Sequence, residues 1–404
     1  MKSFAQFTEA ASKNSNMRHL EDALLLDNEG ANQISQTIDD LVGKLSGESG
    51  GGKQINVTVK WDGNPAVFFG KNPENGQFFV GTKSVFSKSP RIVYNKSDLA
   101  EFYSDNPGLS KILEQCLKLL PKIYPGAGIY QGDLMFSAEQ PKKNTTVKGE
   151  QVIEFRPNTI AYVVGKTQKD LFKRIDNAKL GIVIHTVYSG TEMSNLSMSF
   201  NVSADNFKSS RDVWIDDANF KAMDANALLP KSDVKILDAI VKVIKSNDST
   251  VKKLKADKDA KAARIFAHLN TFAVRTQTTT PERLNLKDYT KDFTQWSVDT
   301  ITADAAKLKS ERGREKKLAT IETFKTVISS KSGKALLVSY LAAIKAKNII
   351  LMTLNKVGNI KTFVRTPEGF KITQHEGFVA ITDGAGVFKL VDRLESTRNN
   401  RNRY

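Results

Sequence analysis

The spacing of the apolar residues changes twice along this chain, and this limits the folds that are open to it. Between residues 57 and 202, outside one helical stretch, apolar residues form short alternating or continuous runs, such as Val57 with Val59 or the run 180–188, which are typical of strands. From residue 231 to residue 350 they recur at helical spacing, and after residue 360 the strand pattern returns. We therefore predict an α+β fold in which a helical domain is inserted into a β-rich one.

These changes also predict the domain boundaries. Residues 46–52, Ser-Gly-Glu-Ser-Gly-Gly-Gly, have the composition of a flexible linker. The predicted parts are an N-terminal helical segment at 1–46, a first part of the β-rich core at 53–229, the inserted helical domain at 230–355, a second part of the core at 356–393 and a basic tail at 394–404. Within the core, the spacing predicts one amphipathic helix over 99–120, with Cys116 on its apolar face.

Composition excludes several classes of protein. Cys116 is the only cysteine, so internal disulfides and thiolate-rich zinc sites are excluded. The four histidines are too scattered to indicate a metal cluster, and His185, inside an apolar run, is interpreted as a buried, hydrogen-bonded histidine. No run of 18 apolar residues occurs and the first residues lack the apolar core of a secretory signal. We expect a cytoplasmic protein with no membrane partner.

The net charge indicates a polyanionic partner. The chain carries a formal charge of +16, and residues 231–350 contain 25 Lys and Arg against 13 Asp and Glu, a net charge of +12. Such a concentration of positive charge favours nucleic acid as the partner. The alternative is that these residues only form a solvated helical surface.

The stretch from Val57 to Ala66 holds the strongest candidate for chemistry. Val57 and Val59 alternate as in a half-buried strand, so Thr58, Lys60 and Asp62 are predicted to share its other face. Gly63 and Pro65 are expected to end the strand. A lysine and a carboxylate would then point into one space beside a turn.

The charged residues that interrupt the predicted strands follow an order that is known from one superfamily. Lys60-Trp-Asp-Gly63 comes first, followed by Gly132-Asp133, Glu376-Gly-Phe-Val379 and Lys389-Leu-Val391. This order resembles motifs I, III, IV and V of the covalent nucleotidyltransferases, which include ATP-dependent DNA and RNA ligases and mRNA capping enzymes. The resemblance is closest to ligase-like proteins of large tailed bacteriophages, and it covers roughly residues 15–200 and 360–393. The stretches that carry this closer likeness are 60–66, Gly81-Thr-Lys-Ser84, Gln131-Gly-Asp-Leu-Met-Phe136, Arg156-Pro-Asn-Thr-Ile160, His185-Thr-Val-Tyr188 and Arg18-His-Leu-Glu-Asp22.

The resemblance implies a fold and a set of site residues. The fold would be an antiparallel-sheet nucleotidyltransferase domain, of the ATP-grasp-like ligase adenylation type, with the basic helical domain inserted in it. Lys60 would attack the α-phosphate of ATP and carry AMP, which requires a deprotonated amine. Asp133 and Glu376 would bind Mg²⁺ or Mn²⁺. The implied catalytic residues are Lys60, Asp62, Glu376 and Lys389, and the implied nucleotide-binding residues are Lys60, Trp61, Gly63, Lys83, Asp133, Tyr162, Lys371 and Lys389.

Individual roles follow from the same resemblance. Asp62 would contact the ribose or the surroundings of the lysine, Lys389 would bind the α-phosphate and Tyr162 would stack on the adenine. Lys83 is equally well interpreted as a surface lysine.

Two positions depart from the family pattern. Asp133 stands where glutamate is common, and Val391 stands where the fifth motif has a second lysine, so one phosphate-binding charge is missing. Lys371 or Lys83 could replace it. Only thirteen residues follow Val391, too few for the OB domain that follows this motif in DNA ligases and capping enzymes.

We therefore predict an RNA-ligase-like, ATP-dependent enzyme that joins polynucleotides through 5′-phosphate and 3′-hydroxyl ends. The alternatives are nucleotidyl transfer to another acceptor, and a catalytically degenerate nucleic-acid-binding protein on a ligase scaffold.

Overall fold

The computed structural model has the predicted α+β character, with helices and largely antiparallel strands in separate stretches of the chain. It describes residues 17–46, 55–147, 149–220, 229–276, 285–356, 361–366, 369–372, 377–382 and 384–391. The basic tail at 394–404 lies outside these residues.

The chain forms two compact units. Unit 1 comprises Met1–Asn16, Asn56–Ala222 and Gly358–Phe378, and unit 2 comprises Met17–Ile55, Met223–Val357 and Val379–Tyr404. Unit 2 contains the helices between Lys231 and Leu354. In addition, the N-terminal helices and the last strands group with these helices.

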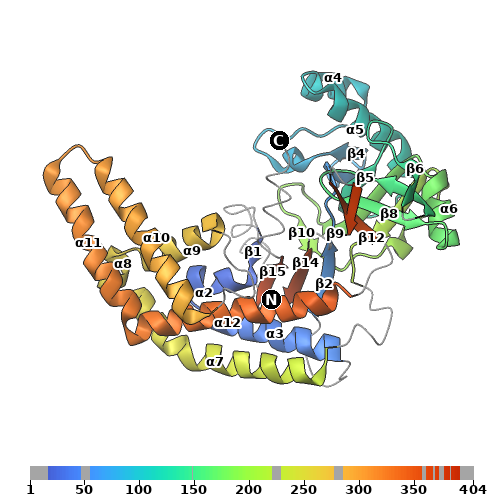
Figure 1. The fold of residues 1–404 in the computed structure, drawn as a ribbon. Helices are drawn as coiled ribbons and strands as arrows, with labels where there is room; N and C mark the ends of the chain where they lie inside the picture. The colour runs from blue at the N-terminus through green and yellow to red at the C-terminus, as the bar shows by residue number, and fades with distance from the viewer. Residues whose placement is uncertain are drawn as a thin grey trace. The chain divides into compact units, whose positions relative to one another are not determined.

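The larger sheet of unit 1 carries the candidate site. Its strands run in the order β10 (Ser197–Ser199), β9 (Leu180–Ser189), β5 (Ile129–Phe136), β3 (Ala66–Lys71) and β4 (Phe78–Gly81), and β11 (Val213–Asp217) lies parallel to β9. The short η2 (Lys83–Phe86) follows β4, and β2 (Ile55–Lys60) precedes β3. Figure 1 shows β4 and β5 of this sheet with α4 (Lys96–Tyr103) and α5 (Pro107–Leu119) close to them.

One face of this sheet is covered by helices. The predicted helix over 99–120 is in fact two, α4 (Lys96–Tyr103) and α5 (Pro107–Leu119), because Asn106 caps a new helix that has proline at its first position. Cys116 is fully buried in the core beneath α5, as predicted. Burial raises the pKa of its thiol to about 12, so this cysteine is unreactive.

A second, antiparallel sheet completes the described part of unit 1. Its order is β13 (Gly369–Ile372), β12 (Lys361–Thr366), β8 (Ala161–Gly165), β7 (Glu150–Phe155) and β6 (Lys143–Val147), with α6 (Lys169–Asn177) packed on β7 and β8. Trp61, Phe136, Phe155, Tyr162 and Trp214 form an aromatic core beside it.

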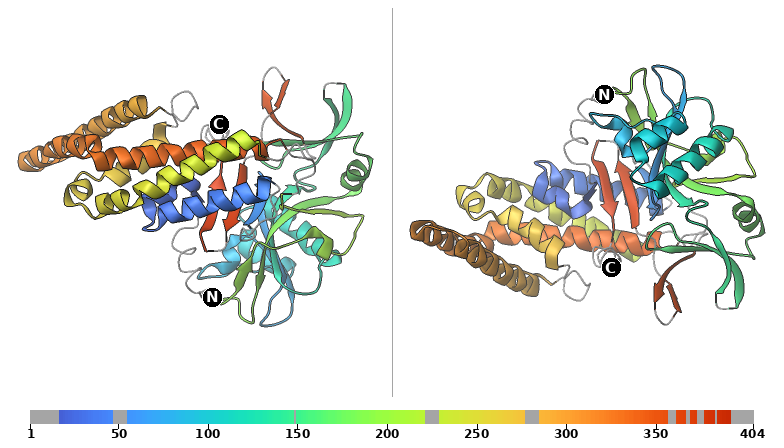
Figure 2. Two further views of the ribbon diagram at one scale, coloured as in Figure 1. Left: turned by 90° about the horizontal axis from the view of Figure 1, so that it is seen from below. Right: turned by 90° about the horizontal axis from the view of Figure 1, so that it is seen from above.

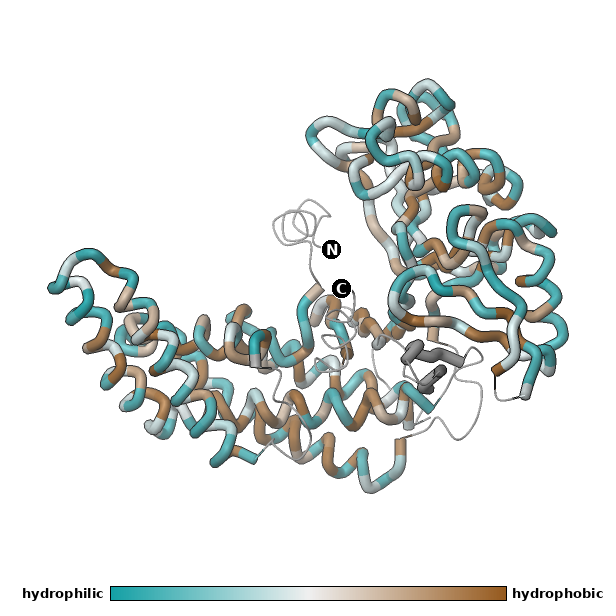
Figure 3. The backbone as a smooth tube through the Cα atoms, turned by 45° about the horizontal axis from the view of Figure 1, so that its top comes forward, coloured by the Kyte–Doolittle hydropathy of each residue, from teal (hydrophilic) through white to brown (hydrophobic). Residues whose placement is uncertain are grey.

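Unit 2 is built on long helices. α3 (Gly30–Ser46), α7 (Lys231–Ala256) and α12 (Lys331–Leu354) pack together, preceded by η1 (Leu20–Asp22) and α2 (Ala23–Leu26). The remaining helices are α8 (Lys258–Ala262), α9 (Ile265–Thr276), α10 (Leu286–Ala306) and α11 (Glu311–Ser329). Polar and apolar residues alternate along these helices (Figure 3), as amphipathic packing requires.

The strands that group with unit 2 are short. β1 (Arg18–His19) runs parallel to β15 (Gly386–Leu390), with His19 opposite Lys389, and β14 (Gly377–Thr382) lies next to β15.

Aromatic residues hold α9, α10 and α11 together. Phe293 on α10 lies between Phe272 on α9 and Phe324 on α11, at ring distances of 5.3 and 5.4 Å. All three rings are buried. The α10–α11 hairpin is therefore anchored at its base.

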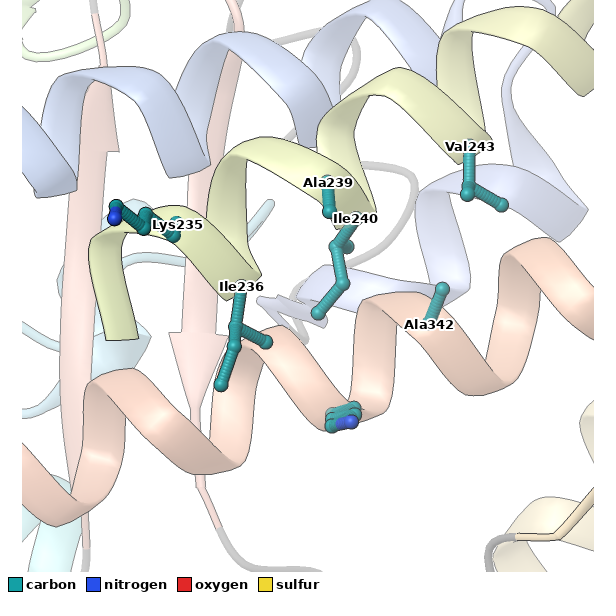
Figure 4. Close-up of a pocket in the computed structure, with 7 residues that line it drawn as sticks. Lys235, Ile236, Ala239, Ile240, Val243 and Ala342 are labelled. Atoms are coloured by element: carbon teal, nitrogen blue, oxygen red, sulfur yellow. The ribbon is translucent and has the colours of Figure 1, made fainter. Parts of the chain in front are cut away.

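A shallow groove of about 320 Å³ lies on unit 2 between α7 and α12 (Figure 4). It is lined by Lys235, Ile236, Ala239, Ile240, Val243, Ala342 and Lys345. Its side chains are aliphatic apart from the two lysines, so it lacks the convergent polar groups that a nucleotide site needs.

α12 is a core helix. Of the described helices, it alone is long and apolar enough to cross a membrane on length and composition, and 61% of the apolar window is buried inside the structure. It also carries a charge into this interior: Lys347 Nζ lies 2.7 Å from Glu21 Oε1, with both side chains at most 2% exposed. The ion pair ties η1 to α12.

Breaking this ion pair should destabilise unit 2. Glu21→Leu leaves the Lys347 ammonium buried without its carboxylate partner, and we expect a decrease of about 3–5 kcal/mol in the free energy of unfolding. The double variant Glu21→Leu/Lys347→Met replaces both charges by apolar groups and should recover most of that decrease. Urea unfolding followed by helical circular dichroism measures both. Equal destabilisation of the single and double variants would contradict this account.

Candidate active site

Lys60 is the last residue of β2, and its side chain is half-buried. The predicted alternation along this strand is only partly correct, because Thr58 is buried as well as Val57. The reason is that the segment from Ala218 to Phe220 pairs with β2: Val59 N donates to Ala218 O at 2.7 Å and Phe220 N donates to Val57 O at 2.8 Å. Covered in this way, β2 fixes the position from which Lys60 extends.

Asp62 holds the turn that follows Lys60. Its carboxylate accepts hydrogen bonds from Asn158 Nδ2 at 2.7 Å, Thr159 N at 2.8 Å and Ile160 N at 3.0 Å, and the residue is 6% exposed. Three donors satisfy a carboxylate that would otherwise be costly to bury. Asp62 therefore anchors the turn to the β7–β8 connection. Asp62 was predicted to contact either the ribose or the surroundings of Lys60. Its buried, hydrogen-bonded position favours the second role.

Tyr162 also has a structural position. Its hydroxyl accepts a hydrogen bond from Asp62 N at 2.7 Å, and its ring packs against Trp61 and Phe155 at centroid distances of 4.9 and 5.6 Å. Tyr162 is fully buried and Trp61 is 9% exposed. Neither ring presents a face to solvent, so the predicted stacking of Tyr162 on adenine is replaced by a role in the core beneath the turn.

Gly63 brings the turn against β5. A Cβ atom on Gly63 would lie 2.4 Å from Asp133 Cβ and 3.0 Å from Leu134 O, so only glycine allows this approach. Two backbone hydrogen bonds seal the contact: Asn64 N donates to Leu134 O at 3.1 Å, and Leu134 N donates to Pro65 O at 3.0 Å. The segments that carry Lys60 and Asp133, predicted from separate motifs, are thereby packed against each other.

His185 lies beside Asp133 because of an irregularity in β9. In the ladder with β5, Gly132 lies opposite Ile184 and Gln131 opposite Thr186, so His185 is the extra residue. Its Nε2 is 4.0 Å from Asp133 Oδ1, and its Nδ1 is 2.7 Å from Thr186 Oγ1. The side chain is 25% exposed. The expected hydrogen bond is present, but sequence reasoning missed the place of His185 at the site. The polar His-Thr pair inside an apolar run was the available signal.

The imidazole of His185 is neutral at physiological pH. Burial lowers its pKa from 6.5 to about 4, and the positive charge of Lys60 acts in the same direction. The effect of Lys60 on this pKa indicates that the Lys60 and His185 side chains are close enough to interact electrostatically. The Lys60 side chain, the Asp133 carboxylate and a neutral imidazole therefore lie around one turn.

The remaining predicted site residues come from other segments of the chain. Lys83 is exposed in η2, and Lys371 lies in β13, where the structure describes only its backbone. Lys389 is half-buried in β15, a strand of unit 2, and Glu376 lies outside the described residues. The predicted second carboxylate of the metal site thus remains a prediction.

The described residues beside this turn offer a metal ion one suitable donor. The Asp133 side chain is 21% exposed and offers the oxygen ligands that Mg²⁺ and Mn²⁺ prefer. Within the described ranges, no three His, Cys, Asp or Glu side chains are grouped so that they could hold a metal. Further ligands would have to come from substrate oxygens, from water or from residues outside these ranges.

The chain belongs to a family of proteins of unknown function (DUF6267), whose model matches residues 14–403. No curated protein and no solved structure matches it. The match spans both compact units. The helices of unit 2 are therefore part of the family's common architecture.

Replacing Gly63 should disturb the site more than its small size suggests. In Gly63→Ala the new Cβ meets Asp133 and the β5 backbone, and we expect overpacking to lower stability by about 1–3 kcal/mol. Gly43→Ala in α3 is the matched control, because a Cβ there meets nothing within 4 Å and alanine favours helix. Thermal unfolding of the two variants tests the contact, and equal midpoints would contradict it.

His185 should make stability depend on pH. Its folded pKa lies below the unfolded value, so the unfolded chain binds the proton first. Stability then decreases as pH falls from 6.5 towards 4, by at most about 3 kcal/mol and by less because the side chain is a quarter exposed. His185→Gln should flatten this part of the stability curve. Urea midpoints measured between these pH values test it, and parallel curves for variant and wild type would refute it.

Proposed function

We propose that this protein is a covalent nucleotidyltransferase of the ATP-dependent polynucleotide ligase type, with Lys60 as its nucleophile. The observation that carries the proposal is the contact of Gly63 with Asp133, which holds the lysine-bearing turn on the carboxylate-bearing strand. Two charged motifs that are about 70 residues apart in sequence meet there, because the absence of a side chain at Gly63 lets the turn approach β5 closely. Their order along the chain resembles that of the nucleotidyltransferases.

The proposed first step needs a lysine in this position. Lys60 Nζ, as the free amine, attacks the α-phosphorus of ATP, the bond from that phosphorus to the bridging oxygen breaks, and pyrophosphate leaves. A phosphoramidate bond then joins AMP to Lys60, and the amine proton passes to solvent or a neighbouring base. AMP next moves to the 5′-phosphate of a polynucleotide, and attack by a 3′-hydroxyl joins the strands and releases AMP.

The surrounding residues have roles that suit this chemistry. Asp62 keeps the turn in place through its three hydrogen bonds, which limits the movement of the nucleophile. The neutral His185 adds no positive charge that would repel a metal ion bound at Asp133. Such an ion would neutralise phosphate charge when bound.

One observation favours a second candidate. Val391, where the superfamily has a phosphate-binding lysine, is 4% exposed and packs as a core residue. A non-catalytic nucleic-acid-binding protein on a ligase scaffold would tolerate the absence of this lysine. The two candidates differ in whether a covalent adduct forms.

Labelling of Lys60 separates these candidates. Wild-type protein incubated with α-labelled ATP and Mg²⁺, then run on a denaturing gel, should give a labelled band. Lys60→Ala should abolish it, and Lys60→Arg should do the same because guanidinium does not deprotonate. Lys118→Ala, at an exposed lysine of α5 for which no site role is predicted, is the matched control and should keep most of the label.

Each outcome has a clear meaning. A labelled Lys60→Ala protein would refute the mechanism. If wild type stays unlabelled with each of the four ribonucleotides, the covalent mechanism is ruled out and the non-catalytic nucleic-acid-binding protein is the remaining candidate. A labelled protein that joins neither RNA nor DNA strands would indicate another acceptor.

A further inference from the structure

The positive charge of unit 2 is used in two different ways. On α7, Lys245 lies 3.3 Å from Asp39, and Lys252 lies 3.0 Å from both Glu29 and Asp248. Lys255 donates to the backbone oxygen of Asp27. These lysines link α7 to α3 and to the segment that joins α2 and α3, so this part of the positive charge already has partners within the fold.

The beginning of α11 is different. Lys309, Arg312, Arg314 and Lys316 are all exposed, and within the described ranges none of the four forms an ion pair or a side-chain hydrogen bond. We call residues 309–316 the hairpin tip. Its two acidic residues, Glu311 and Glu315, are also exposed and form no ion pair with the four basic side chains of this described segment.

The tip lies at the far end of the α10–α11 hairpin. α11 has 19 residues and runs directly into α12, so its first turn is about 28 Å from that junction. Figures 1 and 2 show the turn between α10 and α11 at the end of the hairpin that points away from α3, α7 and α12. The cations are thus presented on a projecting element whose base is fixed by Phe293 and Phe324.

These cations do not help α11 to fold. Arg312 is in the first turn, where the partial positive charge of the helix terminus disfavours a cation by about 0.3–1 kcal/mol. Arg312 and Lys316 are one turn apart, and a like-charge pair at this spacing costs about 0.2–0.5 kcal/mol. These basic side chains slightly destabilise the helix and have no ion-pair partner within the described structure. Both features are expected of a surface that binds an external anion.

We propose that the hairpin tip binds the sugar–phosphate backbone of a polynucleotide strand. The choice of a polynucleotide, over another polyanion, rests on the proposed ligase function. Arginine forms paired hydrogen bonds with phosphate oxygens, and the two lysines act as point charges. Contacts of this kind position a strand without reading its sequence.

Salt dependence gives the measurement. Removing one phosphate contact should lower the log–log slope of affinity against salt by roughly 0.7–0.9, so removing all four should lower it by about 3. The test variant is Lys309→Gln/Arg312→Gln/Arg314→Gln/Lys316→Gln. Fluorescence anisotropy with a short fluorescein-labelled RNA of mixed sequence, and with DNA of the same sequence, follows binding at several salt concentrations.

A matched control removes the same net charge elsewhere. Lys235, Lys242, Lys253 and Lys345 are exposed on α7 and α12 and, within the described part of the chain, pair with no carboxylate. The variant with glutamine at these four positions should keep the wild-type slope. Circular dichroism melts of both variants check that the helices are intact.

The proposal is supported if only the tip variant shows the flatter slope and weaker binding, with either nucleic acid. It is overturned if the tip variant binds both strands like wild type, or if both variants change equally, since that would show a net-charge effect. Labelling of Lys60 with ATP, measured on the same proteins, should be unchanged in the tip variant. If wild type is not labelled, the proposed ligase function is refuted, but the salt-dependence result still decides whether the tip binds a strand. The two proposals can therefore be refuted independently.

Discussion

The candidate site depends on one buried carboxylate. Asp62 receives hydrogen bonds from a side-chain amide and two backbone amides of the β7–β8 connection, and its own backbone N–H binds the Tyr162 hydroxyl. Because the charge is buried, removing these donors would be costly, and the turn after Lys60 has one stable position. The approach of Gly63 to β5 then follows, and with it the meeting of Lys60 and Asp133.

The ladder between β5 and β9 adds the third group to the candidate site. A regular antiparallel register would have paired His185 with a residue of β5, but the shift between Gln131 and Gly132 leaves it as an extra residue. Its imidazole then lies near Asp133 and within reach of the charge on Lys60. A bulge thus changes an ordinary strand residue into a neighbour of the site.

The basic side chains of unit 2 also differ in the partners that surround them. A lysine that lies within the core, Lys347, has a buried carboxylate partner, and Lys252 on α7 has an acceptor at the surface in Glu29. Among the described residues, the basic side chains of the hairpin tip have neither, and Arg312 lies in a helix terminus that disfavours a cation. Net charge alone would treat all these lysines and arginines as equivalent, yet their surroundings give them different tasks.

The sequence by itself determined the α+β class, the helical segment near 230–355, the burial of Cys116 and the pairing of a lysine with a glycine-ended turn, because these depend on local periodicity and turn chemistry. It could not determine that helix 99–120 breaks at Asn106, nor that the N-terminal helices join unit 2. Only the tertiary structure decided which polar residues have hydrogen-bond partners in the interior. The sequence suggested that Asp62 and Tyr162 contact a ligand, but both are buried and hydrogen-bonded within the protein. The physical reason is that hydrogen-bond partners come from segments about a hundred residues away, and no local pattern encodes them.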